Sequence, residues 1–186
     1  MKNVVIISGH PDFKNSVANK AILEEIAAKC PQVEIRKLDE LYPDYQFDVK
    51  AEQAALEAAD VIIFQYPMHW FGVPGIMKLY IDKVMLHGWA YGSQGNALKG
   101  KAFIASVTTG APDAAYKAEG VMQHTVDEFS YPIEKFAATC KMDCKKIFHI
   151  CGMMYVPGLT TDAQKQTLID NAKKYADDVV DYINTL

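Results

Sequence analysis

An aromatic segment between two prolines carries the side chains best suited to holding a flat ligand. Pro67 ends a buried apolar run, and it is followed by Met68, His69, Trp70 and Phe71. Because proline has no N–H to donate to a sheet, the chain must leave the sheet near Pro67. Open α/β sheets bind ligands at the carboxyl ends of their strands, so this segment predicts a site for a flat conjugated molecule. The alternative is that Trp70 and Phe71 only cover the edge of a sheet.

A second group of candidate residues follows the first apolar run of the chain, where a helical pattern begins. Its members are His10, Ser16, Val17, Ala18 and Asn19. The free N–H groups and the positive dipole end at a helix N-terminus favour an anion. The sequence has no glycine-rich dinucleotide or P-loop motif, so we expect Ser16 and Asn19 to hold a phosphate together with the backbone, as in flavin mononucleotide sites. The alternative is plain helix capping by Ser16 or Asn15.

A third polar loop follows the apolar run 101–107. It contains Thr108, Thr109, Gly110 and Ala111, and Tyr116 comes soon after it. Short hydroxyls and backbone N–H groups of this kind suit the polar edge of a heterocycle, where they can stabilise negative charge. If the three apolar runs are parallel strands of one sheet, all three loops lie at the same edge of that sheet.

The elements that must position these loops alternate along the chain. Apolar runs at 4–7, 61–64 and 101–107, the spaced apolar residues of 33–38 and the short segment 146–151 predict strands, and helical patterns begin near residues 16, 51, 75, 126 and 161. Such alternation predicts an α/β fold with a right-handed, doubly wound parallel sheet and helices on both faces. A phosphate loop after the first strand favours the flavodoxin-like strand order 2-1-3-4-5. We expect residues 1–186 to form a single domain.

The composition argues against several classes of protein. A formal net charge of −4 with scattered lysines gives no support to nucleic-acid binding, and no apolar run approaches the roughly 20 residues of a membrane span. The first residues lead straight into a strand without a signal peptide, so we expect a cytoplasmic protein. Cys30, Cys140, Cys144 and Cys151 form no Cys-x-x-Cys pair, and we expect neither a metal site nor a disulfide.

The predicted helix 75–86 is apolar nearly all round. Its polar residues are Lys78, Asp82 and Lys83. One face of such a helix can pack on the sheet, and the opposite face needs a cover, for which a second subunit is the commonest source. The glycine-rich and aromatic segment 87–96 follows directly and is suited to bordering a pocket. We therefore expect a homodimer.

Several motifs, in a consistent order, carry a resemblance to a known family. Gly9-His10-Pro11, Ser16-Val17-Ala18-Asn19, the segment 67–74 and Thr108-Thr109-Gly110 are similar to the signature loops of the flavodoxin-like NAD(P)H:quinone oxidoreductases. Segments 41–44, 51–53 and 87–92 most resemble the bacterial branch that contains the ancillary subunits of glutathione-gated potassium efflux systems. The likeness covers essentially the whole chain, and several independent motifs are more specific than any one of them.

The resemblance implies a flavin cofactor, which we expect to be FMN, with FAD as the alternative, and NAD(P)H as co-substrate. It implies that His10 and residues 16–19 contact the flavin phosphate, that residues 67–71 line the ring, and that residues 108–111 reach its polar edge. Tyr116 matches a tyrosine that helps to relay charge in the animal enzymes of this family. Their histidine six residues further on is replaced here by Met122, and His124 is out of register, so His124 receives no role.

The activity implied is transfer of hydride from a nicotinamide to the flavin and then to a quinone-like acceptor, in a ping-pong reaction. Two alternatives stay open. The same enzyme could reduce nitro, azo or chromate compounds, because an open apolar slot over a flavin admits many acceptors. The chain could instead be a regulatory subunit that docks on a potassium efflux transporter at the inner face of the membrane and uses its flavin mainly as a sensor.

Overall fold

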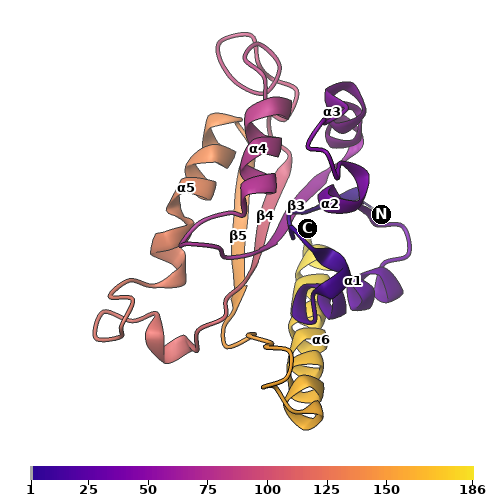
Figure 1. Ribbon diagram of the computed structural model, residues 1–186. Helices are drawn as coiled ribbons and strands as arrows, with labels where there is room; N and C mark the ends of the chain where they lie inside the picture. The colour runs from indigo at the N-terminus through magenta and orange to yellow at the C-terminus, as the bar shows by residue number, and fades with distance from the viewer. Residues whose placement is uncertain (1) are drawn as a thin grey trace.

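A five-stranded parallel sheet forms the centre of the computed structural model, which describes residues 2–186 (Figure 1). Its strands are β1 Val4–Ser8, β2 Glu34–Lys37, β3 Val61–Pro67, β4 Ala102–Thr108 and β5 Asp143–Ile150. They lie in the order β2-β1-β3-β4-β5, and each neighbouring pair is parallel. The predicted α/β fold class and the flavodoxin-like strand order are therefore confirmed.

Helices cover both faces of the sheet (Figure 1). On one face lie α1 Ala18–Lys29 and α6 Asp162–Thr185, and on the other lie α2 Leu38–Leu41, α3 Val49–Ala58, α4 Gly75–Val84 and α5 Val126–Thr139. Successive side chains of a strand point to opposite faces, so Ile63 packs against α1 and α6, whereas Ile62 and Phe64 pack in the opposite core. Both faces of the central strands are buried, as their continuous apolar runs predict.

Several element boundaries differ from the predicted ones. β5 begins at Asp143 instead of residue 146, and α4 ends at Val84 instead of residue 86. Leu38 begins the short helix α2 instead of ending a strand, because a single buried apolar residue fits either element. α5 continues through Pro132. Within residues 2–186, no helix has both the length and the apolar composition needed to cross a membrane.

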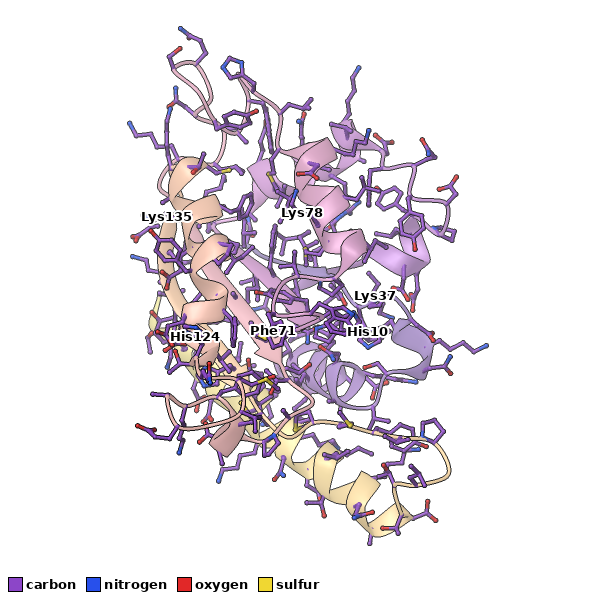
Figure 2. All side chains as sticks on the ribbon, turned by 60° about the vertical axis from the view of Figure 1, so that its left-hand side comes forward. His10, Lys37, Phe71, Lys78, His124 and Lys135 are labelled. Atoms are coloured by element: carbon purple, nitrogen blue, oxygen red, sulfur yellow. The ribbon has the colours of Figure 1, made fainter. Side chains whose placement is uncertain are left out.

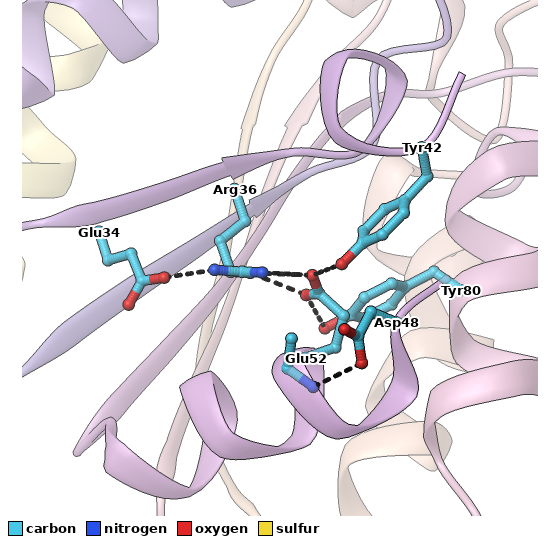
Figure 3. A network of polar contacts seen from close by, with 7 residues as sticks. Glu34, Arg36, Tyr42, Asp48, Glu52 and Tyr80 are labelled. Atoms are coloured by element: carbon cyan, nitrogen blue, oxygen red, sulfur yellow. Dashed lines mark hydrogen bonds and ion pairs between the residues drawn. The ribbon is translucent and has the colours of Figure 1, made fainter. Parts of the chain in front are cut away.

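A buried carboxylate ties the outer part of the sheet to the helices (Figure 3). Glu52 of α3 is fully buried, and it accepts hydrogen bonds from Arg36 of β2 at 2.6 Å and from the Tyr42 hydroxyl at 2.5 Å. The Tyr80 hydroxyl of α4 donates to the same carboxylate at 3.2 Å. Burial and the neighbouring Glu52 raise the pKa of Tyr42 to about 12, so its hydroxyl keeps its proton. The network fixes α4 relative to β2 and so anchors the C-terminal end of the segment 67–74.

Candidate functional site

A cavity of about 530 Å³ lies where the carboxyl ends of β1, β3 and β4 meet the start of α1. The sheet brings the three predicted loops together because these three strands are neighbours. The predicted site residues that line the cavity are His10, Ser16, Val17, Ala18, Asn19, Pro67, Met68, His69, Thr108, Thr109, Gly110, Ala111 and Tyr116. Cofactor and ligand pockets typically enclose roughly 300–1,000 Å³, so the volume suits a small organic molecule.

The N-terminus of α1 supplies an anion-binding end to this cavity. Val17 is the N-cap residue and makes no side-chain hydrogen bond to the helix, and the Asn15 side chain instead donates to Asp12 at 2.9 Å. The predicted capping by Ser16 or Asn15 is therefore wrong, because Asn15 belongs to the short 3₁₀ helix η1 Phe13–Asn15 and Val17, not Ser16, occupies the N-cap position of α1. The N–H groups of that turn have no side-chain cap, and such groups are suited to binding phosphate.

Asn19 lines the cavity, but its amide is bonded inside the protein. Its Nδ2 donates to Thr108 Oγ1 at 3.0 Å, and its Oδ1 accepts a hydrogen bond from Gln65 Nε2. Asn19 is buried and links α1 to β3 and β4, so it positions the start of the helix instead of presenting a free amide. Sequence reasoning missed Gln65. A lone polar residue inside an apolar strand was a signal that its side chain has a hydrogen-bond partner in the fold.

His10 is a neutral donor at the same end of the cavity. The backbone N–H of Asp12 donates to His10 Nδ1 at 3.1 Å, which leaves the ring proton on Nε2. Burial lowers the pKa of His10 below its ordinary value, although the Asp39 carboxylate acts in the opposite direction. A neutral imidazole can donate one hydrogen bond to an anion, as the resemblance to flavin-binding loops implies.

Residues 69–72 form a tight turn beside the cavity. His69 and Gly72 exchange two backbone hydrogen bonds of 3.0 and 3.1 Å across this turn. Its central residues, Trp70 and Phe71, have φ angles of 49° and 65°, a left-handed conformation that costs a non-glycine residue about 1–2 kcal/mol. Phe71, labelled in Figure 2, packs on Phe129 of α5 with 4.9 Å between ring centroids, whereas Trp70 is 95% exposed. Neither aromatic ring lines the cavity, so their contact with a flavin ring stays a prediction.

The loop after β4 offers fewer free N–H groups than the sequence suggests. The Thr109 N–H donates to the carbonyl of Ile150 at 2.9 Å, and the Thr109 hydroxyl donates to the carbonyl of Ala111 at 3.0 Å. Within the described residues the N–H of Gly110 donates to no protein acceptor, which leaves it available to a ligand. A Cβ atom at Gly110 would lie 3.0 Å from Cε of Met154, so a side chain there would crowd the cavity wall.

Tyr116 lies in the cavity wall without a histidine partner. It follows the 3₁₀ helix η2 Asp113–Ala115, is 8% exposed, and packs edge-on against Phe129 with 6.2 Å between ring centroids. Met122 also lines the cavity, whereas His124, labelled in Figure 2, does not, and its Nδ1 lies 3.6 Å from the carboxylate of Glu128. The cavity is therefore lined by a tyrosine, Tyr116, and a methionine, Met122, instead of a tyrosine–histidine pair.

A groove lined by lysines continues from the anion-binding end of the cavity. The two hollows share Asn15, Ser16, Val17 and Tyr155, and the groove encloses about 460 Å³. Its lysines are Lys14, Lys20, Lys165 and Lys173. These lysines come from η1, α1 and α6, which become neighbours only in the folded chain, so the lysines are scattered in the sequence.

Sequence reasoning also missed several residues that line the cavity, namely Asp12, Asn15, Met122, Met153, Met154 and Tyr155.

Known proteins share both the sequence and the architecture of this chain. A family model described as "Flavodoxin-like fold" matches residues 2–180. The chain is 38% identical over 183 residues to the glutathione-regulated potassium-efflux system ancillary protein KefF of Klebsiella aerogenes, with 96% of each chain covered. 

Two solved structures extend the similarity to three dimensions. The first is general stress protein 14 of Treponema denticola in complex with FMN, at 32% identity and a TM-score of 0.84, covering 96% of this chain and 99% of that one. The second is an NADPH-quinone reductase of P. pentosaceus, at 28% identity and a TM-score of 0.74, covering 95% and 98%. Together with the strand order and the position of the cavity, these similarities show that the chain belongs to the flavodoxin-like family.

Proposed function

We propose that this protein is a flavin-dependent NAD(P)H:quinone oxidoreductase that binds FMN in the cavity, with residues 1–186 acting as a single flavin-binding domain. The observation that carries the proposal is the cavity itself, in which an uncapped helix N-terminus, an apolar wall and a polar strand-end loop occur together. The similarity of the whole chain to a protein solved with FMN and to an NADPH-quinone reductase supports the proposal.

The groups around the cavity suit the phosphate of FMN, its flat ring and the polar edge of that ring. The N–H groups of the first turn of α1, the Ser16 hydroxyl and the neutral His10 suit the phosphate. Pro67 and Met68 suit the flat ring, and the N–H of Gly110 suits its negatively charged edge. Bound flavin supplies the group that accepts and returns a hydride.

The chain itself orients the reactants and stabilises charge. The hydroxyl of Tyr116, on a ring held against Phe129, steadies negative charge at the cavity wall as hydride arrives. The N–H of Gly110 acts in the same way from the loop after β4. Met68 and Met122 keep water from the reacting atoms because their side chains are apolar. The nicotinamide and the acceptor occupy one open side of the cavity in turn, which makes the reaction ping-pong.

Steady-state kinetics test this function. The purified, flavin-loaded protein should oxidise NADH or NADPH with a soluble quinone as acceptor. Double-reciprocal plots should give parallel lines, because two substrates that use the same place must compete. Intersecting lines would indicate a ternary complex and a second site, and a flavin-loaded protein that oxidises neither nicotinamide would contradict the proposed enzyme.

FMN is proposed over FAD because the cavity offers an anion-binding end for one phosphate together with an apolar wall and a polar strand-end loop for the flavin ring. FAD remains the alternative, since the lysine groove continues from the phosphate end and its cations suit a second phosphate. Release of the cofactor from purified protein and its chromatographic identification decide between the two. FAD as the released cofactor would overturn the choice of FMN.

A second candidate function rests on the similarity to KefF, which is named as ancillary to a glutathione-regulated potassium-efflux system. We propose that the chain docks on such a transporter at the cytoplasmic face of the membrane. A potassium efflux transporter that copurifies with the chain would support this role, and turnover by the isolated chain distinguishes an enzyme from a pure sensor.

Nitro, azo or chromate compounds are alternative acceptors for the same site, to be compared with quinones by their kcat/KM values.

A homodimer is part of the proposal. Trp70 exposes its indole on a strained turn, a combination that favours burial against a partner. An apolar hollow of about 140 Å³ lies beside this turn between α4 and α5, and Gly72, Val73, Ile81 and Ile133 are among its lining residues. A second copy of the chain that covers this face would also narrow the open side of the cavity.

A further inference from the structure

Three side chains of metal-binding types meet beside the cavity without lining it. Asp113 begins η2, His149 lies in β5 and Cys151 follows β5. One ligand atom from each of the three lies within 4.8 Å of the other two. Asp113 and His149 are exposed and Cys151 is half-buried, so the cluster is open to solvent on one side. The proposed reaction uses none of these side chains.

The backbone around the cluster is held by hydrogen bonds between two strand-end loops. The Thr109 N–H donates to the Ile150 carbonyl at 2.9 Å, and the Gly152 N–H donates to the Ala111 carbonyl at 2.8 Å. The Met153 N–H donates to the Thr109 carbonyl, also at 2.8 Å. These three bonds join the loop that leads to Asp113 with the loop that carries Cys151. The relative positions of the ligand-bearing segments are therefore set before any metal binds.

We propose that Asp113, His149 and Cys151 form a zinc site. Carboxylate, imidazole and thiolate are the three ligand types that zinc takes in proteins, and three protein ligands leave a fourth position for water. With metal–ligand distances of about 2.0–2.3 Å, the ligand atoms of a tetrahedral site lie roughly 3.5 Å apart. Side-chain rotations that move these atoms by about 1 Å would bring the cluster to that geometry. A soft thiolate ligand favours zinc over magnesium or calcium.

The charged neighbours of the cluster are compatible with this role. His149 Nδ1 lies 3.5 Å from Oδ1 of Asp127, and a carboxylate in this position orients a zinc-bound histidine and leaves Nε2 for the metal. Lys117 Nζ lies 3.2 Å from Oδ2 of Asp113, an exposed contact that zinc would replace. The Cys151 thiol loses its proton to solvent as the sulfur–zinc bond forms, and charge is conserved in that exchange.

Bound zinc would join β5 to the segment that carries Tyr116. The Tyr116 N–H donates to the Asp113 carbonyl at 3.0 Å, so a metal on the Asp113 side chain restrains the backbone beside the proposed catalytic tyrosine. Sequence reasoning had looked for metal ligands among closely spaced cysteines and found no Cys-x-x-Cys pair. The fold instead brings Cys151 together with an aspartate and a histidine from other positions.

Equilibrium dialysis of the purified full chain against buffered, micromolar free zinc tests the site. We expect one zinc ion per chain, and at least tenfold weaker binding in Cys151→Ser, His149→Gln and Asp113→Asn. Cys144→Ser and His124→Gln are matched controls, because Cys144 is a half-buried thiol of β5, the strand that precedes Cys151, and neither Cys144 nor His124 belongs to the cluster. Both controls should bind zinc like the unaltered chain. The measurement needs no flavin, so its failure and the failure of the proposed enzyme are distinguishable.

Two outcomes would overturn the zinc site. One is the absence of stoichiometric zinc at micromolar free metal, and the other is equal binding by the unaltered chain and Asp113→Asn. Asp113 is exposed, so Asp113→Asn should fold normally, and circular dichroism checks this. Hydrogen exchange gives a second readout: zinc should slow exchange of the amides of residues 113–117 in the unaltered chain and leave them unchanged in Asp113→Asn.

Discussion

Tyr116 is the side chain on which the proposed reduction step depends most. Tyr116→Phe removes only the hydroxyl, so the flavin content should be unchanged. The rate of flavin reduction by NAD(P)H should fall about tenfold or more, which corresponds to about 1.4 kcal/mol of lost transition-state stabilisation. Stopped-flow absorbance measures this rate. Tyr131→Phe is the matched control, because Tyr131 is exposed on α5 outside the cavity. If Tyr116→Phe reduces its flavin as fast as the control, Tyr116 lines the cavity but does not contribute to hydride transfer.

Burial of His10 predicts a dependence of stability on pH. Desolvation lowers the pKa of His10 in the folded chain below 6.5, the ordinary pKa of a histidine side chain. The unfolded chain therefore binds the proton more strongly, and the contribution of His10 to stability is present above pH 6.5 and is lost as the pH falls below it. Burial also lowers the pKa of His69, which acts in the same direction.

Urea unfolding above and below this pH measures the effect. The free energy of unfolding should decrease on acidification, and the decrease should be smaller in His10→Gln than in the unaltered chain. His124→Gln provides the control, since His124 is exposed and lies outside the cavity. Equal acid sensitivity in His10→Gln and the unaltered chain would contradict the role assigned to this burial.

Among the elements, the contact between β2, α3 and α4 depends on Glu52. Glu52→Ala leaves the guanidinium of Arg36 without its buried partner, so we expect a loss of about 3–5 kcal/mol in the free energy of unfolding. Glu34→Ala is the matched control, because Glu34 pairs with the same arginine at 2.6 Å but its side chain is 52% exposed. The control should lose no more than about 1 kcal/mol. Urea unfolding measures both losses. Comparable losses in the two variants would show that burial of the network adds nothing to the free energy of unfolding.

The central strands β1, β3 and β4 were predictable from the sequence because burial on both faces leaves a continuous apolar run, as at 61–64. The start of α1 was not predictable, since Ser16 is a residue type that caps helices well and the sequence gives no sign of the 3₁₀ helix that precedes Ser16. The turn at Trp70 and Phe71 was missed for a related reason. Bulky residues rarely adopt positive φ, so propensity alone argues against the conformation that they have.

For the molecule as a whole, the proposed homodimer makes Trp70 an interface residue. Trp70→Ala should weaken self-association at least tenfold, because large aromatic residues dominate the binding energy of many interfaces. The stability of the monomer should not fall, since the indole is 95% exposed. Leu159→Ala is the control, because Leu159 is 79% exposed and lies outside the turn. Sedimentation that finds the unaltered chain active and monomeric at micromolar concentration would contradict the dimer.

Contacts between distant parts of the chain account for most of what the sequence did not reveal about the site. Asn19 and Thr108 are 89 residues apart and are joined by a hydrogen bond, so the local pattern around Asn19 indicated a free phosphate ligand. The lysine groove and the Asp113–His149–Cys151 cluster also combine residues from separate elements. By contrast, the three loops at the cavity were predictable, because each directly follows a recognisable strand.

The most direct test of the account is a calorimetric titration of FMN into the apoprotein and into Ser16→Glu. A carboxylate at residue 16 lies near the N-terminus of α1, where negative charge stabilises a helix by about 0.3–1 kcal/mol, so the variant should remain folded. The same carboxylate should repel the flavin phosphate and weaken FMN binding at least tenfold. Ser93→Glu adds the same charge at an exposed position outside the cavity and should leave the affinity unchanged. The account predicts one FMN per unaltered chain with this pattern of affinities, and it is contradicted if the chain takes up no flavin or if Ser16→Glu binds FMN as tightly as the unaltered chain.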